Sequence, residues 1–202
     1  MAIRVLPREA VLRSTDATWT AAEWEQLPDD GHRYEIIEGV LYMATAPSFF
    51  HQWIALEVYS ALRRQLLEPG LAVVVTAPIG LFMPGCDPVQ PDVLVVRQDD
   101  RGIIRDRRVH GVPALLVEVL SPSNEEQDLV VKRAAYARAR VPEYWVARPA
   151  GRDILVHSEP ESATGQYLQV AHVPPGGELI SPTLPFRATI AAFFAGAPDT
   201  TL

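Results

Sequence analysis

Hydrophobic residues recur along the chain with two different periods, and each period predicts one kind of element. Five apolar residues recur at helical spacing and so share one face of a helix: Trp53, Ile54, Val58, Leu62 and Leu66. Ser48 stands before this run as a candidate N-cap, and Pro69-Gly70 follows it. The pattern therefore predicts a long helix that begins after Ser48 and ends before Pro69.

Other segments have the pattern of strands. Three of them are apolar at consecutive positions, which is typical of strands covered on both faces: "LAVVVTA" at 71–77, "DVLVV" at 92–96 and "ALLVEVL" at 114–120. Shorter runs predict further strands over 79–82, 143–148, 153–158, 165–173 and 177–180. The segment "HRYEIIEGVLYMAT" predicts two strands around a turn at Glu38-Gly39.

Capping signals predict two more helices. The T-x-x-E spacing at 20–23 is that of a capping box and predicts a short helix over 21–27. Ser123 or Asn124 can cap a helix that runs to about Arg138.

The remaining segments complete a mixed order of helices and strands. The segment 188–196 predicts a short final helix, and the polar, arginine-rich segment 97–111 predicts a loop or a short helix. The order favours an α/β fold with one central sheet. We expect a single domain over residues 19–202, preceded by an N-terminal tail or extension at 1–18.

Composition and charge narrow the function classes. The chain has 202 residues, of which 48% are hydrophobic and 21% charged, as in ordinary globular domains. One cysteine allows no intrachain disulfide, and neither a secretory signal nor a membrane span is recognisable, so we expect a cytoplasmic protein with no membrane partner. A net charge of −7 argues against a protein that merely coats nucleic acid, because such proteins are usually basic.

Two carboxylates stand in strands that otherwise predict complete burial. Glu118 lies within "ALLVEVL", and Asp92 begins "DVLVV". An unpaired buried carboxylate is costly, so each needs a cation, a partner or a metal. If the two strands are neighbours, a Mg²⁺ or Mn²⁺ ion between Asp92 and Glu118 would turn their repulsion into attraction. The alternative is that Glu118 pairs with an arginine inside the fold and Asp92 caps a turn.

Lys132 favours a functional reading of this pair. It lies about 10 Å along the helix that follows the Glu118 strand, at 1.5 Å per residue. A helix that folds back along the strand therefore brings Lys132 level with Glu118. Lys132 also shares a helix face with Leu129, Ala135 and Tyr136. The alternative is that its side chain extends past Tyr136 to solvent.

These residues carry a resemblance to a known family. The ordered pattern "YEIIEG", "PDVLVV", "VEVLSPS", Asp128, Lys132, Tyr136 and "VPEYW" resembles the Uma-type restriction endonucleases of the PD-(D/E)XK nuclease superfamily, over roughly residues 20 to 195. The resemblance implies a restriction-endonuclease-like core, in which helices flank a central mixed β-sheet. It also implies Mg²⁺-dependent hydrolysis of phosphodiester bonds in DNA and a homodimer.

The resemblance assigns roles by position. It places the metal-binding acids at Asp92 and Glu118, and a further catalytic acid at Glu35, with Glu38 a weaker candidate. The superfamily lysine, two residues after the second acid, falls on Leu120, and Lys132 is the natural replacement as catalytic lysine. His51 also matches the family pattern, although a histidine there is more often a surface or capping residue.

Three functions remain open from the sequence. The first is a metal-dependent DNA endonuclease, the second is a non-catalytic nuclease-fold module that binds nucleic acid or a protein, and the third is a hydrolase of small phosphate esters. Five arginines could bind phosphates: Arg97, Arg101, Arg105, Arg107 and Arg108. A solvated loop balanced by Asp99, Asp100 and Asp106 is the slightly favoured reading of that segment.

Overall fold

The protein is built on a six-stranded mixed sheet with helices on both faces. The computed structural model describes residues 12–15, 18–28, 30, 32–44, 46–121 and 125–196. The strand order is β13-β12-β11-β10-β7-β4, and within this sheet only β10 and β11 run parallel. The strands are β4 (Ala72–Thr76), β7 (Val93–Arg97), β10 (Leu115–Val119), β11 (Glu143–Arg148), β12 (Asp153–Glu161) and β13 (Gln166–Val173). The predicted α/β class with a central mixed sheet is confirmed.

The central strands of this sheet are those with apolar residues at consecutive positions, so that they present apolar side chains on both faces. Side chains of β10 alternate between two hydrophobic clusters: Leu115 and Val117 belong to one, and Leu116 belongs to the other. Every residue of β10 is buried. The strand is therefore covered on both faces, as its sequence predicts.

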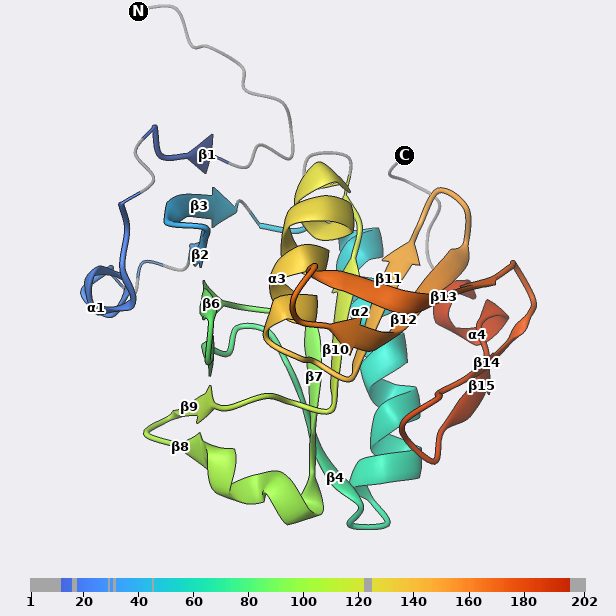
Figure 1. Cartoon of the computed structure of the whole chain (residues 1–202). Helices are drawn as coiled ribbons and strands as arrows, with labels where there is room; N and C mark the ends of the chain where they lie inside the picture. The colour runs from blue at the N-terminus through green and yellow to red at the C-terminus, as the bar shows by residue number, and fades with distance from the viewer. Residues whose placement is uncertain are drawn as a thin grey trace, which may run out of the picture.

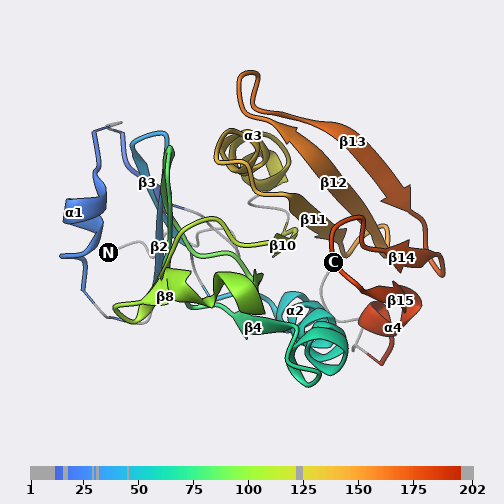
Figure 2. The ribbon, with the colours of Figure 1, turned by 60° about the horizontal axis from the view of Figure 1, so that its bottom comes forward.

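Helices from different parts of the chain cover the two faces. Figure 2 shows α2 and α3 on opposite sides of the central sheet. One face is covered by α2 (Phe49–Leu62), its π-helical continuation η1 (Arg63–Leu67) and the short α4 (Ala191–Phe194). The other face is covered by the π-helical segment η3 (Gln127–Lys132) and α3 (Arg133–Arg138). Among the described residues, no helix is long and apolar enough to cross a membrane.

Three smaller sheets accompany the predicted central sheet in the part of the chain that the structure describes. They have the orders β1-β3-β2, β6-β5-β9-β8 and β14-β15, and Figure 1 shows the first beside α1 (Ala21–Trp24). Their strands are β1 (Leu12–Arg13), β2 (Arg33–Ile37), β3 (Val40–Ala44), β5 (Leu81–Met83), β6 (Cys86–Val89), β8 (Ile104–Arg105), β9 (Arg108–His110), β14 (Glu178–Ile180) and β15 (Arg187–Thr189). Several of these strands have only two or three residues, too few for a recognisable period.

Local signals set the boundaries of several elements. Thr20 and Glu23 form the predicted capping box of α1, and the Ser48 side chain caps α2. Glu38 and Gly39 both have positive φ, as the turn between β2 and β3 requires. The arginine-rich segment forms the 3₁₀ helix η2 (Gln98–Ile103) before β8 and β9, where a loop or short helix was expected. The predicted caps Ser123 and Asn124 lie outside the described residues.

Glu143 fastens the C-terminal segment to the face of the sheet opposite Glu118. Glu143 lies two residues before Trp145 in β11, so both side chains are on the same face of the sheet. Trp145 packs in the hydrophobic cluster that contains residues of α2 and α4. Its carboxylate accepts hydrogen bonds from Trp145 Nε1 at 2.5 Å and from the hydroxyls of Ser181 and Thr183 at 2.6 Å each. Neutral donors thus compensate a fully buried carboxylate, which makes Glu143 a structural residue.

Replacing Glu143 should therefore destabilise the fold. In Glu143→Ala, the buried donors Trp145 and Ser181 and the half-buried Thr183 lose their acceptor, and the free energy of unfolding should fall by about 3 kcal/mol in urea denaturation. Glu178→Ala removes an exposed carboxylate of β14 and serves as the control, with an expected change within about 0.5 kcal/mol. Equal stabilities of the two variants would contradict this role for Glu143.

Candidate active site

Asp92 and Glu118 lie at the same end of two neighbouring strands. Asp92 immediately precedes β7, and Glu118 lies within β10. The strands are antiparallel with Val93 opposite Val117, so the next step of this register sets Asp92 opposite Glu118. The two residues are 4% and 1% exposed. The two strands are therefore neighbours, which meets the condition set by the sequence, and the candidate carboxylates lie side by side.

Asp92 is held by donors from three elements. Its Oδ1 accepts a hydrogen bond from Arg33 Nη1 at 2.8 Å; its Oδ2 lies 3.1 Å from His51 Nε2 and accepts the Val119 backbone N–H at 2.9 Å. Burial acts to raise the pKa of Asp92, but the charges of His51 and Arg33 outweigh burial and hold it well below its usual range. Asp92 is therefore ionised at neutral pH, with three of its roughly four acceptor sites used.

Glu118 has a different environment. Its Oε1 accepts hydrogen bonds from Lys132 Nζ at 3.0 Å and from the Tyr136 hydroxyl at 2.9 Å. Burial raises the pKa of Glu118 well above its usual value, against the opposing effect of Lys132. Asp92 and Glu118 thus have pKa shifts of opposite sign, an arrangement found where paired carboxylates have different roles.

The ammonium group of Lys132 contacts three buried carboxylates. Nζ lies 3.0 Å from Glu35 Oε2, 3.0 Å from Glu118 Oε1 and 3.3 Å from Asp128 Oδ1. Burial acts to lower the pKa of Lys132, but the carboxylates outweigh it and raise the pKa well above its ordinary value. At 3% exposure, the side chain does not reach solvent, and the predicted contact with Glu118 is confirmed.

Glu35 belongs to this cluster, whereas Glu38 does not. From β2, Glu35 accepts the Gln90 backbone N–H at 2.7 Å with Oε1, while its Oε2 contacts Lys132. It therefore links the segment before β7 to η3. Glu38 lies at the turn after β2, is 61% exposed and pairs with Arg138 at 2.9 Å.

Asp128 is a carboxylate in excess of the available donors. It is completely buried, and neither of its carboxylate oxygens has a hydrogen-bond partner among the described residues. Burial raises the pKa of Asp128 to about 6, despite the nearby ammonium of Lys132. Buried carboxylates thus outnumber the cations that face them.

Sequence reasoning missed Arg33 and gave His51 too little weight. Side chains alternate along β2, so the sequence could have predicted that Arg33 shares a strand face with Glu35. It could not have predicted that Asp92 is the partner of Arg33. His51 is 5% exposed and is neither a surface nor a capping side chain. Its spacing from Ile54 and Val58 is that of one buried helix face, and this signal was available.

The carboxylate oxygens of this cluster are chemically suitable ligands for a hard divalent cation. Carboxylate oxygens are the ligands that Mg²⁺ and Mn²⁺ prefer, and both oxygens of the buried Asp128 lack a hydrogen-bond partner among the described residues. Within the described part of the chain, however, no group of three or more His, Cys, Asp and Glu side chains is arranged to hold a metal ion. In this arrangement the Lys132 ammonium is the cation shared by three of the carboxylates.

Comparison with known proteins identifies the family. The protein-family model described as "Uma2: Putative restriction endonuclease" matches residues 21–192 of the chain. The chain belongs to the Uma2 family. A similar solved structure is that of "a putative nuclease belonging to DUF820 from Anabaena variabilis ATCC 29413", with a TM-score of 0.72 at 17% identity, covering 87% of this chain and 97% of that chain. At this identity the likeness shows the shared fold. No curated protein matches the chain.

This Uma2 chain has a leucine at the position where the resemblance to PD-(D/E)XK nucleases implies a lysine. Leu120, where the resemblance implies a lysine, is 8% exposed and packs in the hydrophobic cluster that contains Leu116 and Tyr136. Lys132 supplies an ammonium group to Glu118 from η3 instead. π-Helical turns are rare in proteins, and those that occur are often found at functional sites. The π-helical segment η3 carries both Asp128 and Lys132.

Asp128→Asn should change the pH dependence of stability. The folded-state pKa of about 6 lies above the ordinary value of 3.8, so between these values the folded protein keeps a proton that the unfolded chain has lost. The free energy of unfolding of the wild type should therefore fall, relative to that of the variant, by about 1–3 kcal/mol as the pH rises from about 4 to about 6. Urea denaturation across this range measures the difference, and parallel profiles would contradict it.

Proposed function

We propose that this protein is a metal-dependent endonuclease that hydrolyses phosphodiester bonds in DNA. Membership of the Uma2 family supports a nuclease. The observation that carries the proposal is the pair of buried carboxylates with opposite pKa shifts, next to an ammonium group that is itself buried. Strongly shifted acids beside a charged partner are typical of catalytic sites.

Asp92 and Glu118 are the residues that would hold Mg²⁺ or Mn²⁺. When bound, such an ion polarises the scissile phosphate and lowers the pKa of a bound water. Arg33 and His51 keep Asp92 ionised and fix its orientation, while Tyr136 fixes Glu118 through a hydrogen bond at 2.9 Å.

Lys132 supplies the positive charge of the proposed reaction. Through its charge, it can stabilise the negative charge that develops on the phosphate oxygens as water attacks phosphorus and the phosphorus–oxygen bond breaks. Glu35 and Glu118 restrain its ammonium group from two sides at 3.0 Å each. Glu35 thus acts as a positioning residue for Lys132 rather than as a group that touches the substrate.

A non-catalytic nuclease-fold module is the second candidate. It is favoured by the absence of a metal-binding arrangement of three or more ligands among the described side chains, and by Leu120 at the superfamily lysine position. Such a module would bind nucleic acid or a protein partner without cleavage.

The leading proposal also includes a homodimer and a cytoplasmic location. The homodimer rests on the family resemblance, and the cytoplasmic location rests on the single cysteine.

Metal binding tests the proposed ligands. Titration calorimetry should detect Mn²⁺ binding to the wild type and not to Glu118→Gln. At a concentration 100 times Kd, the ion should stabilise the fold by about 2.7 kcal/mol. Glu143→Gln alters a buried carboxylate on the opposite face and serves as the control, which should bind Mn²⁺ as the wild type does. Equal binding by Glu118→Gln would place the metal elsewhere.

Replacing Lys132 tests its role in cleavage. Lys132→Met leaves three buried carboxylates without their ammonium group, so Lys132→Met/Asp128→Asn is made alongside it to restore part of the charge balance. Both variants should nick plasmid DNA about 10²–10³ times more slowly than the wild type in Mg²⁺ or Mn²⁺. A folded double variant that nicks at the wild-type rate would exclude Lys132 from the chemistry. A folded wild type without any nicking activity would favour the non-catalytic module.

A further inference from the structure

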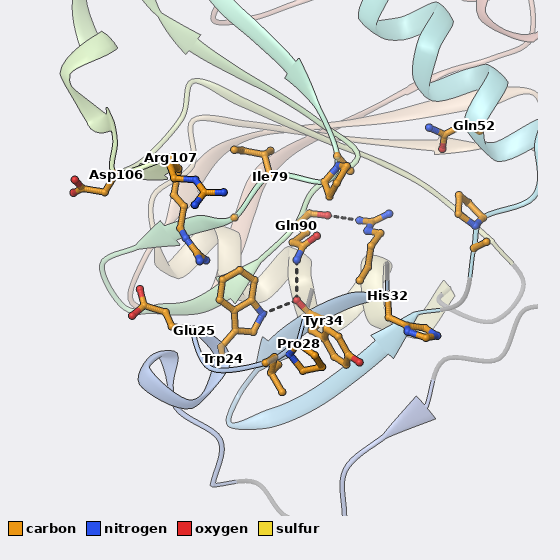
Figure 3. Close-up of a pocket in the computed structure, with 18 residues that line it drawn as sticks. Trp24, Glu25, Pro28, His32, Tyr34, Gln52, Ile79, Gln90, Asp106 and Arg107 are labelled. Carbon is orange, nitrogen blue, oxygen red and sulfur yellow. Dashed lines mark hydrogen bonds between the residues drawn. The ribbon is translucent and has the colours of Figure 1, made fainter. Parts of the chain in front are cut away.

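A pocket of about 1010 Å³ lies next to the carboxylate cluster. Its wall includes Arg33 and Gln90; Arg33 is bonded to Asp92, and the Gln90 backbone is bonded to Glu35. Figure 3 shows Trp24, Tyr34 and Gln90 close together among the residues that line this pocket, with Arg107 on one side of the view and Gln52 on the other. The pocket therefore leads from the surface to two residues that contact the proposed metal ligand Asp92 and the positioning residue Glu35.

Arg108 is fixed on the wall of this pocket by aromatic rings rather than by an acid. Its guanidinium lies 4.6 Å from the ring centroid of Trp24 and 5.5 Å from that of Phe82. The side chain also passes close to Gly80, where an added Cβ would lie 3.3 Å from Nη1. The aromatic contacts hold the guanidinium in place. Because Arg108 forms no ion pair among the described residues, its N–H donors remain available to a ligand.

Arg107 stands beside it in a strained backbone conformation. Asp106 and Arg107 form the two-residue turn between β8 and β9, with φ of 51° and 65°. This left-handed region favours glycine or asparagine, so an arginine here carries a conformational cost. Its side chain is exposed and makes no ion pair with any described residue. Strain of this kind clusters at functional sites.

The charge of the pocket differs from that of the whole chain. Three arginines line it against two carboxylates, Glu25 and Asp106, whereas the chain carries a net charge of −7. The other arginines of the same segment are placed differently: Arg97 donates to the Thr183 carbonyl, and Arg101 and Arg105 are exposed outside this pocket.

We infer that this pocket is the substrate cleft, in which Arg107 and Arg108 bind a backbone phosphate of DNA next to the one that reaches Arg33. The inference rests on the proposed function for the identity of the ligand, and it adds where the strand lies. Guanidinium groups bind phosphate oxygens through paired hydrogen bonds, and such contacts position a strand without reading its sequence.

Two matched pairs of variants test this inference. Arg107→Gly removes the charge and suits the left-handed turn; Arg140→Gly makes the same change at φ 64°, outside the pocket. Arg108→Gln is paired with Arg105→Gln, because Arg105 lies opposite Arg108 in the same strand pair but outside the pocket. Fluorescence anisotropy with a fluorescein-labelled DNA duplex, in chelator, measures binding without cleavage over a range of salt concentrations.

Each pocket variant should bind duplexes of different sequence more weakly to the same extent. The slope of log affinity against log salt should fall by about 1 for each arginine removed, because one phosphate contact is lost. Arg107→Gly should also melt at or above the wild-type temperature, since the strain is relieved. The two control variants should keep the wild-type salt slope.

The outcomes separate this inference from the proposed function. Equal losses in pocket and control variants, or no DNA binding by the wild type, would overturn the substrate cleft. Selective loss in the pocket variants supports the cleft even if no protein nicks DNA, and that combination overturns only the catalytic proposal.

Discussion

The rest of the site depends on one contact, that of the Lys132 ammonium group with Glu35, Glu118 and Asp128. Burying a carboxylate without a partner costs several kcal/mol, and here three converge from β2, β10 and η3. A single buried cation therefore links the β1-β3-β2 sheet, the central sheet and the π-helical segment, in addition to the bonds of Arg33 to Asp92 and of Glu35 to the Gln90 backbone. Burial nevertheless raises the pKa values of Glu118 and Asp128, and neighbouring carboxylates add to this effect, because the one ammonium group does not offset both.

A buried carboxylate by itself does not mark a site, as Glu143 shows. It is as deeply buried as Glu118 and belongs to the motif "VPEYW", yet three neutral donors satisfy it on the opposite face. What distinguishes the cluster around Glu118 is the surplus of acid over cation and the nearby pocket lined by Arg33. The kind of partner, rather than burial, separates a structural acid from a candidate catalytic one.

Much of the central architecture could be predicted from local pattern. β7 and β10 are apolar at both parities, so their position in a covered sheet was predictable, and α2 follows from five apolar residues at helical spacing. The strands of the β6-β5-β9-β8 sheet could not be predicted equally well, because they have two to four residues and lie among prolines, glycines and arginines. Elements this short form only because neighbouring strands supply their hydrogen bonds.

The sequence by itself determined that Asp92 and Glu118 need compensation, since a charge in a doubly covered strand is costly wherever the strand lies. The α-helical period also favoured a sheet-facing Lys132, although the structure forms this segment as the π-helical η3. Only the tertiary structure decided which cations serve Asp92. Arg33 reaches it across 59 positions of the chain, and His51 reaches it from α2. The packing of separate sheets and helices selects such partners, and no local pattern specifies which of several arginines arrives at one carboxylate.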